Sequence, residues 1–206
     1  DDMWESSFYD FLNFYQNLKN EEVYLEELDH KICQYICENL AEQDYTDAFG
    51  YYELIRHSER CVGHIQSALV EEVGNALEND ERYTAQNIYS WMESYNIEYE
   101  EVSRLIYEYA CELMERDEYE EARYCFQTLL DYNDPWFAED SVYMRELAIL
   151  QYYISNEWYY DAKYQVDRFS GEIHDKLLEV LLEYCADKYV IADLEAEEEF
   201  FAYRAC

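Results

Sequence analysis

The sequence predicts an all-α fold of stacked antiparallel helix pairs, and two observations carry that prediction. Only four glycines and one proline occur among 206 residues. An all-β fold needs frequent turn residues, so this scarcity favours long helices with short links. The second observation is a recurring phrase, in which a Tyr (once an Arg) stands three residues before an Ala that is followed by an apolar helix. The alanines of this phrase are spaced 37, 37, 40 and 30 residues apart, as in stacks of helix–turn–helix units, and they are Ala48, Ala85, Ala122, Ala162 and Ala192.

Taken in order, the elements read as amphipathic helices separated by short polar breaks. Residues 23–41 place Leu25, Leu28 and Ile32 on one stripe, with the spacing of a single helix face. The polar residues 42–44 break this helix. By the same reasoning, further helices are expected at residues 45–60, 64–79, 82–95, 99–116, 119–132, 139–156, 158–169, 172–188 and 190–204.

These elements form one expected domain over residues 1–206. Its first part, 1–20, would be an N-terminal capping helix, followed by four helix-pair repeats over 21–170 and a degenerate C-terminal capping pair over 171–206. The clearest signal for the end of a helix is Pro135. It lacks an amide donor and biases the residue before it away from the helical conformation. No linker or low-complexity stretch separates the parts.

The phrase itself resembles the tetratricopeptide (TPR) repeat, whose second helix needs a small residue where it crosses its partner and a large residue one turn later. The matching residues are Tyr45, Ala48, Tyr52 and Ile55; Arg82, Ala85, Tyr89 and Met92; Tyr119, Ala122, Phe126 and Leu129; and Tyr159, Ala162, Val166 and Phe169.

The resemblance covers residues 30–204 and implies a TPR-like α-solenoid, a right-handed superhelix of helix pairs. Two features depart from the family. The spacing is longer and less regular than the family's period, and Asp44 or Asp117 replaces the usual glycine before the Tyr. The alternative is an irregular helical bundle in which the alanine spacing is accidental.

The charge of the chain is extreme. It carries 49 Asp and Glu against 14 Lys and Arg, a formal net charge of −35. The electrostatic field of a chain with this charge repels nucleic acid and anionic membrane surfaces. It attracts basic proteins, cationic peptides or divalent cations. We therefore expect a basic protein or peptide as partner, no direct nucleic-acid binding and no membrane insertion. The simpler interpretation is that the acids only keep a tyrosine-rich surface in solution.

The seven cysteines are an odd number, so they cannot all pair within the chain. Most of them lie inside apolar helical stretches, where a free thiol behaves as a small hydrophobic group. This usage favours a reducing compartment such as the cytoplasm. Because the chain opens with Asp1 rather than Met, a trimmed extracytoplasmic domain is the alternative.

Four residues of the first helix pair are candidates for a metal site. If residues 23–41 and 45–60 form an antiparallel hairpin, His30 and His57 approach each other, with Cys33 and Cys37 nearby. Neutral imidazoles and thiolates suit Zn²⁺. The spacing matches no zinc signature, however, and both cysteines border the apolar stripe. Packing is therefore preferred, and no metal or cofactor is expected.

No catalytic motif stands out. Four scattered glycines provide no phosphate-binding loop, and no serine lies in a nucleophile elbow. Carboxylate pairs for acid–base chemistry cannot be distinguished among so many acids. We therefore expect that the protein is not an enzyme.

The candidate contacts for a partner come partly from the resemblance, which implies that the first helix of each repeat lines a concave groove. On this basis the groove residues are Arg104, Tyr107, Glu115 and Gln151, although packing of Tyr107 between helices is equally compatible. Two acidic clusters add candidate contacts, unless they are only solvated faces: Glu118, Glu120 and Glu121, and Glu197, Glu198 and Glu199.

These observations favour a non-enzymatic, acidic helical-repeat module that binds a basic protein or peptide. The alternative is a nucleic-acid mimic that inhibits a DNA- or RNA-binding protein, as anti-restriction inhibitors do, with carboxylates standing in for phosphates. A third hypothesis is an assembly-forming protein, favoured if exposed tyrosines form one apolar patch. The sequence does not indicate the oligomeric state.

Overall fold

The computed structural model describes residues 10, 13–17, 26–42 and 44–187. These residues form an all-α structure, with no strand in any of the described ranges. The chain divides into two compact units, Asp1–Val102 and Ser103–Cys206. The prediction of a single domain over 1–206 stays a prediction.

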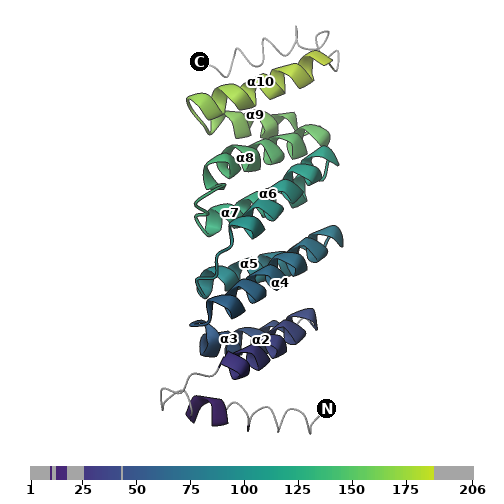
Figure 1. The fold of residues 1–206 in the computed structure, drawn as a ribbon. Helices are drawn as coiled ribbons and strands as arrows, with labels where there is room; N and C mark the ends of the chain where they lie inside the picture. The colour runs from purple at the N-terminus through teal and green to yellow at the C-terminus, as the bar shows by residue number, and fades with distance from the viewer. Residues whose placement is uncertain (1–9, 11–12, 18–25, 43, 188–206) are drawn as a thin grey trace. The chain divides into compact units, whose positions relative to one another are not determined.

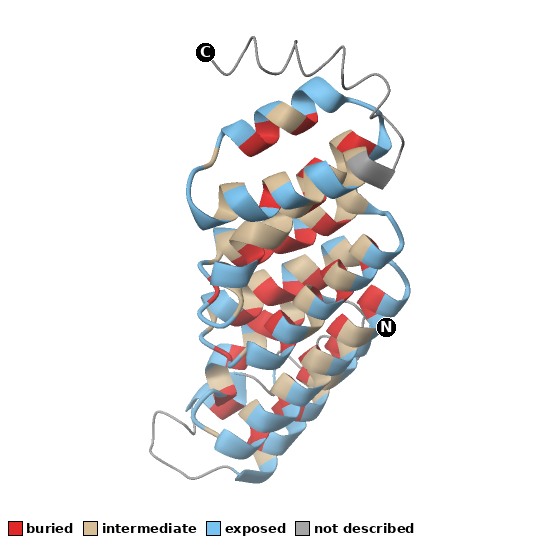
Figure 2. Cartoon of the chain, turned by 90° about the horizontal axis from the view of Figure 1, so that it is seen from above, coloured by how far each residue is buried: buried red, intermediate tan, exposed pale blue. Residues whose placement is uncertain are grey.

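Four long helices lie in the described part of the first unit (Figure 1). They are α2 (Glu26–Ala41), α3 (Tyr45–Ile55), α4 (Glu59–Glu78) and α5 (Arg82–Ser94). Helix α2 packs against both α3 and α4, and α4 packs against α5. The core lies where these helices meet, and Ile32, Ile36 and Leu69 are completely or almost completely buried in it. Figure 2 shows the buried residues on such helix faces and the exposed residues on the outer ones.

Aromatic rings join α3 to α5 within this unit. The ring centroids of Tyr45 and Trp91 are 4.9 Å apart, and those of Phe49 and Trp91 are 5.1 Å apart. Phe49 also stacks on Tyr95, with centroids 5.2 Å apart and ring planes at 25°. Offset and edge contacts of this kind add stability beyond the burial of apolar area. Many of the abundant aromatic residues therefore serve packing between helices.

The described residues of the second unit form most of α6 and four further helices. They are α6 (Glu100–Glu115), which begins in the last residues of the first unit, α7 (Tyr119–Asp131), α8 (Ala138–Ser155), α9 (Tyr159–Asp167) and α10 (Glu172–Asp187). Helix α8 packs against α7, α9 and α10, and α10 also packs against α9. Leu150, Val166 and Leu177 lie at the centre of one buried cluster in this unit.

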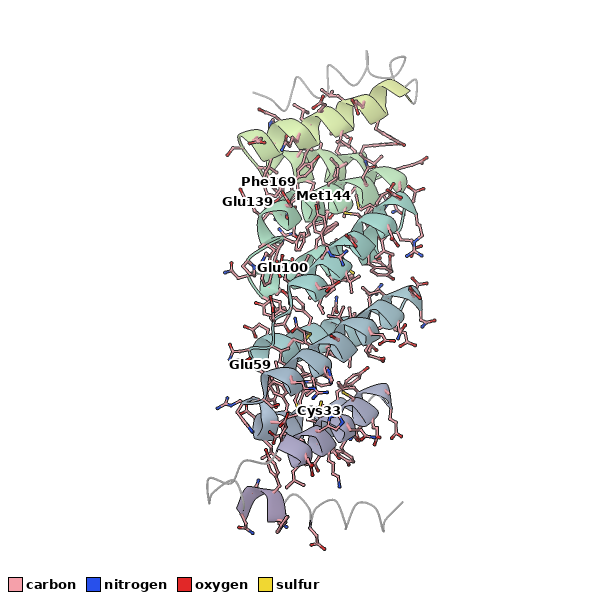
Figure 3. The ribbon with its side chains drawn as sticks, viewed as in Figure 1. Cys33, Glu59, Glu100, Glu139, Met144 and Phe169 are labelled. Atoms are coloured by element: carbon pink, nitrogen blue, oxygen red, sulfur yellow. The ribbon has the colours of Figure 1, made fainter. Side chains whose placement is uncertain are left out.

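The repeated phrase marks equivalent buried positions in four helices. The alanine is at most 1% exposed each time, in α3, α5, α7 and α9. The large residue four positions later is also buried each time. The residue seven positions later is buried in α3, α5 and α7, whereas its counterpart Phe169 (labelled in Figure 3) lies just beyond the end of α9 and is half-buried. A small residue lets a second helix approach closely, which is why the phrase places Ala there. Ala192, the fifth member, lies outside the described residues.

Five described helices, α4 to α8, end in the same hydrogen-bonded turn. At the end of α6, the Asp117 amide donates to the Met114 carbonyl at 3.2 Å and the Glu118 amide donates to the Leu113 carbonyl at 2.8 Å. This pair of bonds is the Schellman motif, which requires a residue in the left-handed region. Glycine is usual there, but this chain uses Asp80, Asn96, Asp117, Asn133 and Glu157, with φ between 49° and 61°.

The link between α7 and α8 is organised by Asp134, which is 2% exposed. Its Oδ1 accepts hydrogen bonds from the amides of Trp136 at 2.9 Å and Phe137 at 2.7 Å. Its Oδ2 accepts a hydrogen bond from the Ser103 hydroxyl of α6. The predicted stop at Pro135 is confirmed, because α7 ends at Asp131 and α8 begins only at Ala138.

One predicted break is wrong. The second and third helices were expected to separate at residues 61–63, but the link is at residues 56–58 and α4 begins at Glu59. Ser58 has extended backbone angles and precedes the first turn of α4. Cys61 and Ile65 are both buried on one face of α4, so the apolar stripe continues through the expected break.

Several other expectations concern residues outside the described ranges. The predicted helix at 190–204 and most of the capping segment 1–20 lie there. None of the described helices has the length and apolar character needed to span a bilayer.

Candidate protein-binding surfaces

The outer face of α6 carries a row of charged side chains. Arg104, Glu108, Glu112 and Glu115 are all exposed, and their spacing of three or four residues places them on one side of the helix. Arg104 Nη1 lies 3.0 Å from Oε1 and 2.9 Å from Oε2 of Glu108. The acidic row of α6, defined as Glu108, Glu112 and Glu115, thus extends beyond this ion pair.

Tyr107 lies on a different side of α6 and is half-buried. Its ring stacks on Phe137, with centroids 5.0 Å apart, and meets Phe126 edge-on at 5.6 Å. Burial raises the pKa of its hydroxyl. These contacts favour the packing interpretation of Tyr107 over its role as a partner contact. Gln151, the groove candidate from α8, is also half-buried.

The acidic cluster before and within the first turn of α7 is partly neutralised by arginines. Arg116 Nε lies 3.3 Å from Oε1 of Glu118, and Arg123 Nη2 lies 3.3 Å from Oε1 of Glu120. Glu121 is half-buried. Glu120 and Glu121 also stand where the helix dipole favours negative charge, so this cluster has structural reasons to be acidic. The second predicted cluster, Glu197, Glu198 and Glu199, lies outside the described residues.

The structure brings together a polar cluster in the first unit that differs from the predicted one. His57 Nε2 lies 3.1 Å from Oδ2 of Asp29, the residue before His30, while His30 itself is exposed. The Tyr15 hydroxyl donates to Oδ1 of Asp29, and this bond together with burial raises the pKa of Tyr15. The predicted approach of His30 to His57 is off by one residue, because α2 turns Asp29 inward.

The neighbouring cysteines form thiol contacts. The interaction of Cys33 (labelled in Figure 3) with Cys37 lowers the pKa of Cys37 to about 7, while the pKa of the buried Cys33 is raised. Cys33 Sγ also lies 3.8 Å from the Cys61 carbonyl. Within the described ranges, no three His, Cys, Asp or Glu side chains are grouped to hold a metal ion.

A pocket in the second unit gathers basic residues that sequence analysis missed. It has a volume of about 320 Å³ and lies between α7, α8 and the end of α9. Its lining is Arg123, Tyr124, Gln127, Arg145, Glu146, Ile149 and Arg168. Three of the chain's 14 basic residues therefore line one cavity.

Hydrogen bonds around the buried Glu146 and Gln165 fix this pocket. Arg145 pairs with Glu146 and donates to Gln127 Oε1 at 2.7 Å. Gln165 donates to the other oxygen of Glu146 and accepts at 3.1 Å from Arg168. Glu146 and Gln165 are each 1% exposed. The arginines are far apart in sequence, so only a knowledge of how α7, α8 and α9 pack could have brought them together.

No protein-family model matches the chain, and no curated protein or solved structure does either. The function is therefore inferred from the residues of this chain alone.

Proposed function

We propose that the protein is a non-enzymatic, TPR-like helical-repeat module that binds a basic protein or peptide. The repeat part of this proposal is supported by the buried alanines at equivalent positions of α3, α5, α7 and α9. The observation that carries the binding part is the acidic row of α6.

The acidic row suits a cationic segment for a physical reason. Residues four positions apart on a helix are about 6 Å apart along its axis, so one extended or helical basic segment can meet several of these carboxylates. The net charge of −35 would raise the rate of encounter with a cationic partner, whereas the local row would set its position. Tyr107 is not part of this contact surface, since its ring packs on Phe126 and Phe137.

The first experiment measures binding of a fluorescein-labelled, lysine-rich peptide by fluorescence anisotropy at several salt concentrations. Affinity should fall several-fold between about 0.05 and 0.3 M NaCl, because salt screens exposed charges. The triple variant Glu108→Gln, Glu112→Gln, Glu115→Gln should weaken binding about five-fold or more.

A matched control separates the row from the general field. The triple variant Glu71→Gln, Glu78→Gln, Glu93→Gln removes the same charge from exposed sites on α4 and α5, and it should weaken binding less than about two-fold. If both triples weaken binding equally, the row has no special role and only the net charge attracts the peptide.

The same row of carboxylates favours a second candidate function, a nucleic-acid mimic, because mimicry requires acids in rows on one face. Affinity capture from lysate of the source cell, with elution by DNA or RNA, distinguishes the two. Elution of a nucleic-acid-binding enzyme by the competitor would support mimicry. A retained partner without nucleic-acid function, insensitive to the competitor, would support the interaction module.

A further inference from the structure

We propose that the arginine-lined pocket between α7, α8 and α9 binds a phosphomonoester group. This site is separate from the acidic row of α6 and does not depend on the function proposed above. It would give an otherwise acidic protein a local site for a doubly charged oxyanion.

The charges of the pocket lining fit such a group. Arg123, Arg145 and Arg168 contribute three positive charges, and Glu146 contributes one negative charge. The lining therefore carries a net charge of +2, and the Glu120 carboxylate that pairs with Arg123 lowers it to +1. A phosphomonoester, which carries up to −2 near neutral pH and offers three strong acceptor oxygens, is attracted by this surplus of positive charge. Guanidinium groups are the donors that best match phosphate geometry.

The hydrogen-bond network leaves donors available for a ligand. Arg145 pairs with the carboxylate of Glu146, the one acidic residue of the pocket lining. Arg168 donates to the neutral Gln165 and forms no ion pair with any carboxylate of the described residues. The Nε of Arg123 is buried and lacks a hydrogen-bond partner in the described part of the chain. Arg123 donates through Nη2 to Glu120 and to the Tyr124 hydroxyl, so its Nε is the one buried donor of this side chain left without an acceptor in the described residues. A purely structural network would be expected to satisfy this Nε as well, since buried unsatisfied donors are costly.

The size and surroundings of the cavity allow a small aromatic or peptide-borne phosphate. Its volume of about 320 Å³ is at the lower end of the range for ligand pockets. Tyr124 lies at the pocket, 44% exposed, and the Arg123 guanidinium sits over its ring at 4.7 Å. Glu120, which also pairs with Arg123, is partly exposed at the edge of this arrangement.

The test is a titration of the full chain with phenyl phosphate in phosphate-free buffer. Isothermal titration calorimetry measures the binding. The wild type should bind in a one-to-one, saturable manner. Arg168→Gln should weaken binding about ten-fold or more, and Arg123→Gln should do the same, since each removes a charge-assisted contact. Circular dichroism confirms that the variants are folded.

The matched control is Arg104→Gln, which removes one positive charge from the exposed face of α6 and should change the affinity less than about two-fold. Equal weakening by Arg104→Gln and Arg168→Gln would overturn the site. So would the absence of binding by the wild type at about 10 mM ligand, or equal affinity for benzoate, which carries a single charge and offers two acceptor oxygens instead of three.

Two further probes assign the source of the phosphate. A phosphotyrosine peptide that binds more tightly than phenyl phosphate would point to a phosphorylated protein side chain. Equal or weaker binding of the peptide would point to a small phosphorylated molecule, and both results support the phosphomonoester site.

Discussion

Helices α4 to α8 each end at one residue with left-handed backbone angles. The energetic cost of these angles differs among the five residues. Asp and Asn tolerate this region because their short polar side chains bond locally. Four of the five turns use one of these two residues, and the fifth uses Glu157 with φ of 59°. Glutamate has no such compensation, so the α8–α9 turn carries the largest local strain of the five.

Replacing Glu157 by glycine should therefore stabilise the protein. Glycine adopts φ of 59° without strain, and this gain exceeds its extra entropy in the unfolded chain, so we expect an increase of about 0.5–1 kcal/mol in the free energy of unfolding. Urea denaturation, monitored by circular dichroism, measures this change in the free energy of unfolding.

The control is Glu157→Gln, which removes the same charge but keeps the side chain that is strained at this φ. It should leave the free energy of unfolding within about 0.5 kcal/mol of the wild type. If Gln stabilises the protein as much as Gly does, relief of charge repulsion rather than backbone strain is the cause.

At the scale of elements, the links determine where each helix starts. The α7–α8 link is held by one buried side chain, Asp134, which accepts hydrogen bonds from two amides and from Ser103 of α6. A carboxylate in this position fixes the link and, through Ser103, connects it to a third helix. This explains how a link longer than the others between the described helices α2 to α10 stays ordered.

Asp134→Ala should lower the free energy of unfolding by about 3 kcal/mol, because it leaves two amides and a buried hydroxyl without their acceptor. Thermal and urea denaturation measure the loss. The exposed Asp131→Ala at the end of α7 is the control and should change stability by less than about 0.5 kcal/mol.

A double-mutant cycle with Ser103→Ala isolates the contact between α6 and the link. Loss of the serine should cost less in the Asp134→Ala background than in the wild type, by about 1 kcal/mol or more. Strict additivity would show that the Ser103 bond contributes nothing to stability.

At the scale of the whole molecule, two composition features dominate: net negative charge and tyrosine. Many tyrosines are buried in part, and burial raises the pKa of their hydroxyls in both units, including Tyr45 and Tyr52 in the first. In the second unit, burial and the hydrogen bond to Asp117 raise the pKa of Tyr119 to about 12. Ionising these hydroxyls also adds to an already large negative charge.

Stability should therefore fall in alkaline solution. A hydroxyl whose pKa is about 10 in the unfolded chain and about 12 in the fold favours folding below pH 10. That contribution is lost as the pH rises from about 10 to 12. The melting temperature, measured by circular dichroism from pH 8 to 12, should drop steeply above about pH 10.

Two variants test the cause of this fall. Tyr119→Phe should make the decline shallower, whereas Tyr160→Phe, at a position 66% exposed, should leave it unchanged. A melting temperature that stays constant up to about pH 11.5 would contradict the assignment.

Much of the fold followed from local pattern. The helix from Arg82 and the helix from Tyr119 begin where the repeated phrase predicts, and both end within one residue of expectation. The missed link at residues 56–58 has a physical reason: neither glycine nor proline marks it, and the stripe through Cys61 gives no local sign that α4 starts at Glu59.

The candidate sites were less predictable. The exposed positions of Arg104 and Glu115 follow from helical periodicity alone. The packing of Tyr107 does not follow from periodicity, because a half-buried Tyr can either line a groove or pack in a core. The arginine pocket could not be inferred at all, since Arg123, Arg145 and Arg168 lie on three elements whose mutual packing no local pattern specifies.

By itself, the sequence determined the helical class, the positions of the repeated alanines and the acidic character, because these depend on composition and on periodicity within a few turns. Only the tertiary structure decided that Asp29 rather than His30 meets His57, that Asp134 holds a link, and that three arginines share a cavity. Such contacts join residues about 20 to 45 positions apart, and their formation depends on how helices pack rather than on the propensity of any segment.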